Sequence, residues 1–357
     1  MDSLTHALLG AAIGESVLGR QAGKKAMLMG GLAGLAPDID VFVGMFMSDI
    51  DKLIFHRGIT HSFAFILLSS PLVGWLSLRV DRFWTRRQPG GDGAPSASFA
   101  QWTLLAFLAQ LSHILLDSFT SYGTQVYLPF ISDAIALSTI SIIDPLYTLP
   151  LIGSVLALIM MPATARHRAR IGFLAVLLSS LYLGATVGNK MYVQAQFEQA
   201  YTEAGIEVEE TDIKPTLFNN LLWRGIAREK GTDRYYTGYF SVADGRHDIR
   251  LYELEGHHEL IQPWRDTKEL RRLRWVSEGF YQIEAHPDGY LFNDLRFGRV
   301  SEFTDDEQTP YAFSYLIEFD DAGTVSKVQR IELNVDPQRE RRSLGLLWAR
   351  IWGDEQF

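Results

Sequence analysis

Residues 62–80 read SFAFILLSSPLVGWLSLRV, an apolar segment in which Arg79 is the only charged side chain. A membrane-spanning helix needs about 20 such residues, and about 17 can suffice. Three further apolar segments, at 102–116, 146–161 and 171–187, carry no charge, although the first two are short unless their flanks join the helix. Four such segments so close together favour membrane helices over the alternative, buried helices of a soluble protein.

The regions on either side of these segments differ in composition. Two shorter apolar stretches, at 4–18 and 26–36, precede them, and we expect half-length helices packed against the longer ones. The sequence thus predicts a membrane domain of five or six helices over residues 1–190. Residues 191–357 are polar and mixed, which predicts an extramembrane α+β domain. We expect the last membrane helix to continue through 192–204, strands at 235–242, 248–254, 280–285, 311–319 and 325–333, and a final helix at 341–352.

Composition narrows the classes of function. The net charge is −9, and the acidic residues lie largely in the second half, which argues against nucleic acid as a partner. The chain has no cysteine, so that disulfides and thiolate metal sites are excluded. Any metal must therefore be held by nitrogen and oxygen ligands.

Basic residues predict the orientation in the membrane, since cytoplasmic loops carry an excess of Lys and Arg. They cluster at 20–25, 79–87 and 166–170, whereas the loop at 121–145 has none. We therefore expect a multi-pass protein of the cell inner membrane, with residues 191–357 outside the cytoplasm.

This orientation brings most potential metal ligands of the first half to one membrane face. Ionisable groups at membrane depth are costly and suggest a functional site. His167, in a basic loop, is the exception, and Asp144 is left open as a ligand. The predicted ligands are His6, Asp38, Asp40, His56, His61, His113 and Asp117.

The spacing of these residues adds support. His113 and Asp117 are four apart on a helical pattern, so that both side chains lie on one face. Asp38 and Asp40 flank one residue of a turn, and His61 follows a glycine turn. Each residue alone has an ordinary alternative as a helix cap, turn residue or interfacial side chain. Those alternatives do not explain why the residues share one face.

Four motifs carry a family resemblance over about residues 1–189. In this order they resemble the bacterial and archaeal YdjM-like family, described as LexA-binding, inner-membrane-associated, metal-dependent hydrolases. The predicted outside position of the site argues against the LexA link for this chain. The motifs are Met1-Asp2-Ser3-Leu4-Thr5-His6, Pro37-Asp38-Ile39-Asp40, His56-Arg57-Gly58-Ile59-Thr60-His61-Ser62 and Ser112-His113-Ile114-Leu115-Leu116-Asp117.

The resemblance and the ligand set together predict a membrane-embedded metal-dependent hydrolase. Zinc is favoured, in one to three ions, with manganese or iron as alternatives. Asp40 is the candidate general base, and Arg57 is a candidate electrostatic stabiliser or lipid-headgroup anchor. We expect a lipid or lipid-linked ester or phosphoester as substrate. The pair His113 and Asp117 is also similar, by analogy only, to all-helical zinc-dependent phospholipases C and nucleases.

Two other functions stay open from the sequence. A non-enzymatic membrane protein with a structural or sensory metal site would have a closed ligand set. A metal transporter would need polar groups through the bilayer, and residues 63–68 and 104–108 offer no ligand. A protein partner of the second domain is undetermined, and His257, His258 and His286 are expected to be solvated loop residues.

Overall fold

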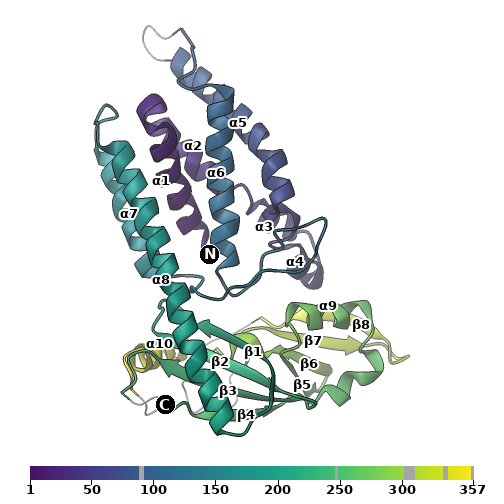
Figure 1. Ribbon diagram of the computed structural model, residues 1–357. Helices are drawn as coiled ribbons and strands as arrows, with labels where there is room; N and C mark the ends of the chain where they lie inside the picture. Colours follow the sequence, from purple (N-terminus) through teal and green to yellow (C-terminus); the bar gives the residue numbers. More distant parts are fainter. Residues whose placement is uncertain (88–91, 246–247, 301–309, 333–336, 355–357) are drawn as a thin grey trace. The chain divides into compact units, whose positions relative to one another are not determined.

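The computed structural model describes the chain apart from residues 88–91, 246–247, 301–309, 333–336 and 355–357. The described chain divides into two compact units. The first comprises residues 1–46, 55–189 and 217–220. The second comprises residues 47–54, 190–216 and 221–357. Figure 1 shows the first as helices and the second as mainly strands.

The first unit begins with two closely packed helices, α1 (Ser3–Ala22) and α2 (Lys24–Gly34). Asp2 caps α1 by accepting a hydrogen bond from the backbone of Thr5. A Cβ on Gly10 or Gly14 would overlap carbonyl oxygens of α2, so that only glycine permits this approach. The close crossing fixes the start of α1 beside the end of α2.

Four further helices follow in the chain: α5 (Phe63–Arg86), α6 (Phe99–Ser118), α7 (Pro145–Met160) and α8 (Arg168–Glu203), the last of which continues from the first unit into the second. Ser62 caps α5, and Ser98 with Gln101 forms a capping box on α6. α6 packs on α1, α2 and α5, and α7 packs on α1. The helices α5, α6 and α8 are long and apolar enough to cross a membrane, whereas α7 is shorter, with 16 residues.

A buried ion pair joins α1 to the start of α8. The Arg168 guanidinium donates to both carboxylate oxygens of Glu15, from Nε at 2.9 Å and from Nη2 at 2.7 Å. Both side chains are almost fully buried. Because a buried charge is tolerated only when it is paired, this contact fixes the two helices against each other.

The second unit contains two four-stranded antiparallel sheets, with strand orders β1-β2-β3-β4 and β5-β6-β7-β8. Val193, Phe197 and Tyr201 of α8 pack against the first sheet. Leu270 and Leu273 of the short helix α9 (Lys268–Val276) pack against the second. The strands are β1 (Val208–Pro215), β2 (Leu222–Glu229), β3 (Arg234–Ser241), β4 (Leu251–Glu255), β5 (Tyr281–His286), β6 (Gly289–Asp294), β7 (Ser314–Phe319) and β8 (Val325–Arg330), and α10 (Pro337–Ile351) follows them.

The sequence predicted the helical first part, the extension of α8 and the mixed second part, and the structure confirms these. It did not predict β1, β2, β6 or α9. β1 and β2 carry charged side chains along their length, such as Glu209, Asp212 and Arg228, and neither strand alternates between buried and exposed residues, so the sequence pattern of a strand is missing. Part of the predicted strand at 325–333 lies outside the described residues.

Candidate metal centre

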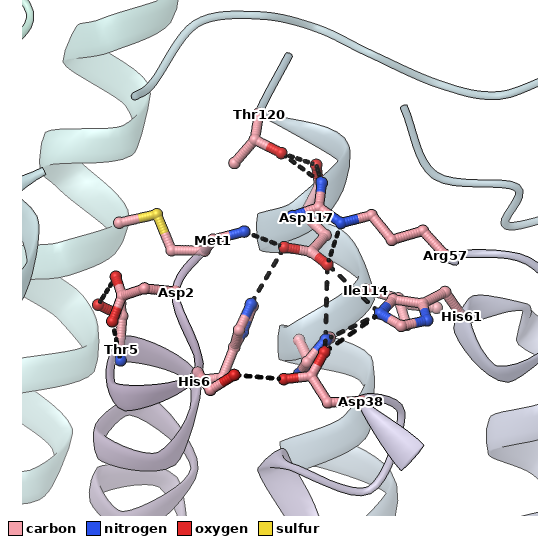
Figure 2. Close-up of polar contacts among 12 residues, drawn as sticks. Met1, Asp2, Thr5, His6, Asp38, Arg57, His61, Ile114, Asp117 and Thr120 are labelled. Carbon is pink, nitrogen blue, oxygen red and sulfur yellow. Dashed lines mark hydrogen bonds and ion pairs between the residues drawn. The ribbon is translucent and has the colours of Figure 1, made fainter. Parts of the chain in front are cut away.

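The predicted ligands come from four places in the first unit. His6 lies in the first turn of α1, Asp38 is the N-cap of α3 (Ile39–Gly44), and Asp40 lies in the first turn of α3. His56 follows α4 (Asp49–Phe55), and His61 ends a 3₁₀ turn, η1 (Ile59–His61). His113 and Asp117 lie one turn apart near the end of α6. Figure 2 shows His6, Asp38, His61 and Asp117 pointing toward one another.

His113 is held in a defined tautomer. Its Nδ1 lies 2.6 Å from the carbonyl oxygen of Gly34, the last residue of α2. A carbonyl can only accept, so that Nδ1 carries the proton and Nε2 keeps its lone pair. A hydrogen bond of this kind, on the ring nitrogen away from the ion, is characteristic of histidines that bind metals.

The Nε2 atom of His61 faces the Nε2 atom of His113. The two Nε2 atoms are 3.1 Å apart, and both rings are buried. On the other side of the His61 ring, Nδ1 lies 3.1 Å from Thr60 Oγ1 and 3.4 Å from Asp40 Oδ2. Two neutral imidazoles cannot both present lone pairs at this distance without repulsion. A shared proton or a cation would relieve it.

Asp38 completes a group of three. Its Oδ1 lies 3.5 Å from His113 Nε2 and 3.7 Å from His61 Nε2. Its Oδ2 accepts a hydrogen bond of 3.0 Å from Ser3 Oγ. Ligand atoms arranged tetrahedrally about zinc at about 2.1 Å are roughly 3.4 Å apart. The spacing of these three donor atoms therefore fits one divalent cation.

Asp117 lies next to the same two imidazoles and makes a second possible group with His6 and His113. Its Oδ2 is 3.4 Å from His61 Nε2 and 3.5 Å from His113 Nε2. His113 takes part in both groups, and only its Nε2 is free of a backbone partner. An imidazole nitrogen binds one ion, so that a cation at His113 could use either group, or ligands from both.

Asp117 also has positively charged and imidazole neighbours. Arg57 Nε lies 3.1 Å from Oδ2, and His6 Nε2 lies 3.0 Å from Oδ1. The amino group of Met1 contacts Oδ1 as well. Arg57 is oriented by Thr120, whose Oγ1 accepts from Nη1 at 2.6 Å. The carboxylate thus sits between a guanidinium and the imidazole cluster.

His6 stacks on His113, with ring centroids 3.6 Å apart. Its Nδ1 is buried and has no hydrogen-bond partner among the described residues. A buried polar atom without a partner is costly, and its presence beside four other ligand-type side chains fits a site built to hold a further group.

Asp40 lies behind His61, on the side away from His113. Its Oδ2 accepts a 2.8 Å hydrogen bond from the backbone of Arg57 and lies 3.4 Å from His56 Nδ1. Its Oδ1 is buried without a partner in the described part of the chain. A carboxylate behind a histidine orients that ring and increases its basicity. This position corresponds to a supporting residue, and ligation by Asp40 or His56 stays a prediction.

The neighbouring imidazoles hold the acids ionised. Burial raises the pKa of Asp38, but the hydrogen bond to His61 and the nearby His113 outweigh it and hold the pKa below its usual range. Burial also raises the pKa of Asp40. The hydrogen bond to His56 and the nearby His61 outweigh burial, so that the pKa of Asp40 is lowered overall. Burial lowers the pKa of His61, but its contacts with Asp117 and Asp38 raise it overall. The carboxylates are therefore charged at neutral pH, as metal ligands must be.

All seven predicted ligands lie in this cluster, but Asp144 has a different role. It caps α7 by accepting from the backbone of Leu146 and Tyr147, and its Oδ2 accepts from the Tyr182 hydroxyl at 2.8 Å. Sequence reasoning missed Thr120 and the Gly34 carbonyl. The position of Thr120, three residues after Asp117, could have suggested its place beside the cluster. No sequence signal marks a backbone carbonyl.

Comparisons with known proteins bear on the same region. Over 152 residues, the chain is 32% identical to the uncharacterized protein YfhP of Bacillus subtilis (strain 168), an alignment covering 41% of this chain and 42% of the relative. The chain thus matches about two fifths of that relative's length. No solved structure matches. The family model of the YdjM inner membrane protein matches residues 1–193, and because this is more than half of the chain, the protein belongs to the YdjM inner membrane protein family.

Proposed function

We propose that this protein is a membrane-embedded hydrolase that uses a divalent metal to cleave a lipid or lipid-linked ester or phosphoester. One observation carries the proposal. The Nε2 atoms of His61 and His113 and the Oδ1 atom of Asp38 face one another at 3.1–3.7 Å, with the tautomer of His113 set by a backbone carbonyl. A donor set of two imidazoles and a carboxylate is typical of catalytic zinc sites that keep a further position for water.

Asp38, His61 and His113 would hold the ion, and Asp117 and His6 are further ligands within reach of His113. The thiolate-free donor set favours zinc and is compatible with manganese or iron. A bound divalent cation supplies Lewis acidity and makes water a nucleophile near neutral pH.

Two residues have proposed roles in the reaction itself. Arg57 is buried and held by Thr120, so that its guanidinium is a fixed positive charge beside the cluster, suited to stabilising a developing oxyanion. The Oδ1 atom of Asp40, which has no partner among the described residues, can take a proton, while its Oδ2 orients His61 and accepts from the backbone of Arg57.

The surroundings of Asp38 and Asp40 support a lipid-linked substrate. The short helix α3 follows directly, and its apolar side chains are exposed, with Phe42 at 65% and the nearby Phe46 at 89%. Asp38 is the least buried member of the donor set, since its side chain is 17% exposed. An apolar surface next to the most accessible ligand suits a substrate with acyl or prenyl chains.

Turnover tests the proposal. The full chain, purified in detergent and loaded with zinc, is assayed on a panel of phosphodiester, phosphomonoester and carboxyl-ester lipid substrates. We expect hydrolysis of one class, lost in His113→Ala and Asp117→Ala and retained in His167→Ala, which removes an exposed histidine outside the cluster. Absence of turnover on every class by metal-loaded wild type would contradict the proposal.

The burial of the cluster favours one alternative, a structural or sensory metal site. His6, His61, His113 and Asp117 are each at most 2% exposed, which is typical of ligands closed off from solvent. This alternative predicts bound metal that lends thermal stability, without hydrolysis of any substrate in the panel.

A further inference from the structure

A cavity of about 490 Å³ lies in the second unit, separate from the metal centre. Its lining includes four arginines, Arg228, Arg265, Arg271 and Arg274, together with Trp275 and Tyr281. No carboxylate side chain contributes to the lining that the structure describes. The cavity size falls within the range of small-molecule binding sites, about 300–1,000 Å³.

The arginines of this cavity differ in how far their charge is compensated. Arg228 lies 3.3 Å from Glu209 and 2.9 Å from Glu210. By contrast, Arg265, Arg271 and Arg274 have no carboxylate within ion-pair distance in the described part of the chain. Three of the four lining arginines therefore have no matching acid among the residues that the structure describes.

Two of these arginines lie on one face of helix α9. Arg271 and Arg274 are three residues apart and so lie on neighbouring positions of one helical face. Leu270 and Leu273 pack into the core and hold the helix against the second sheet. Arg272, between them, forms an ion pair with Asp51 and does not line the cavity. The helix thus separates one compensated arginine from two uncompensated ones.

The lining residue Tyr281 is part of an aromatic stack. The Tyr281 ring is stacked between His258, with centroids 3.9 Å apart, and Phe292, at 4.6 Å. His258 is half-buried, with Nε2 3.0 Å from the Tyr281 carbonyl oxygen, so the expectation that it is a solvated loop residue is wrong. Burial lowers the pKa of His258, so that it adds no further charge at neutral pH.

We propose that this cavity binds a phosphoryl group, carried by a molecule larger than phosphate itself. Guanidinium groups match the oxygens of phosphate with paired hydrogen bonds, and all the cationic lining residues are arginines. A single phosphate would fill only a small part of the space. Trp275, 40% exposed, offers an indole face to the rest of the ligand. A soluble phosphorylated compound and a phospholipid headgroup share this chemistry.

Calorimetric titration of the purified full chain tests the proposal. EDTA is present throughout, so that phosphate cannot bind through the metal centre. One arm uses pyrophosphate, and the other uses dihexanoyl phosphatidic acid, with dihexanoyl phosphatidylcholine as the zwitterionic comparison. The variants are Arg271→Gln, Arg274→Gln and their combination, and Arg272→Gln is the matched control on the same helix.

We expect saturable binding of at least one anionic probe, weakened roughly tenfold by each cavity variant and more by the combination. Arg272→Gln should bind as the wild type does, and circular dichroism should show all variants folded. Binding of pyrophosphate alone points to a soluble ligand, and binding of phosphatidic acid alone points to a headgroup. The proposal fails if neither probe binds the wild type, or if Arg272→Gln weakens binding as much as the cavity variants do.

Discussion

The two units of this protein concentrate opposite kinds of side chain. The first gathers acids and imidazoles in its interior, where Asp38, His61 and His113 face one another. The second lines a cavity with arginines, of which Arg271 and Arg274 have no acidic partner among the described residues. The first arrangement is suited to a cation and the second to an anion. One chain can thus present two ligand preferences, because each folding unit positions its own charges.

The largest expected effect contrasts buried and exposed ion pairs of the two units. Glu15→Ala leaves the buried Arg168 charge without its partner, and we expect a loss of about 3–5 kcal/mol of stability. Asp51→Ala removes a partner of the more exposed Arg272 in the second unit and should cost at most about 1 kcal/mol. Thermal unfolding of both variants in the same detergent measures the difference. Equal losses would show that burial does not distinguish the two pairs.

The close contact of α1 and α2 gives the next effect. Gly14→Ala would push a methyl group into the backbone of α2, and we expect a cost of about 1–3 kcal/mol. Gly153→Ala in α7 is the matched control, because nothing lies within 4 Å of its added Cβ. Metal affinity should also fall in Gly14→Ala, since the α2 carbonyl at Gly34 orients His113. Unchanged melting of Gly14→Ala would contradict this packing.

The role of Asp40 is tested by a smaller change. Asp40→Asn keeps the shape but removes the charge behind His61, and we expect metal affinity to fall about 10–100-fold. His56→Ala, on the partly exposed side of Asp40, should change affinity less. Competition with a chelator of known affinity gives both values. A larger loss in His56→Ala than in Asp40→Asn would identify His56 as the ligand.

The smallest and most gradual effect is that of pH. A proton and a metal ion compete for Nε2 of His61, and the raised pKa of His61 favours the proton. Metal affinity should therefore be full at alkaline pH and begin to decrease above about 6.5, the ordinary imidazole value, as the pH falls, because the pKa of His61 is raised. The same chelator competition, repeated between pH 8 and pH 5, measures it. Affinity that is flat across this range would exclude imidazole ligation.

The convergence of imidazoles and acids was predictable from sequence and the arginine cavity was not, for a physical reason. Apolar surroundings make His113 and Asp117 conspicuous, and their spacing of four places them on one helical face. In the second half, Arg271 and Arg274 occur among many charged residues, so that no contrast marks them. Their convergence with Arg228 depends on the tertiary structure, which brings residues of β2 and α9 to one cavity.

The different positions of Asp38 and Asp40 in the cluster could be learned only from the structure. From the sequence, Asp38 and Asp40 are equally good candidates for metal ligands, because they are two residues apart in one predicted turn. In the fold, Asp38 faces the Nε2 atoms of both histidines, whereas Asp40 lies at Nδ1 of His61. The direction of each side chain follows from the turn into α3 and the position of η1, which no local pattern specifies.

Metal content tests the central claim most directly. The full chain is purified, loaded with zinc and exchanged into metal-free buffer, and its zinc content is measured by mass spectrometry. The proteins compared are the wild type, Asp38→Asn, His61→Ala and His113→Ala, with His167→Ala as the control. The account predicts close to one zinc per chain in the wild type and in His167→Ala, and at most a small fraction of that in the other three. Equal zinc in all five proteins, or none in the wild type, would contradict it.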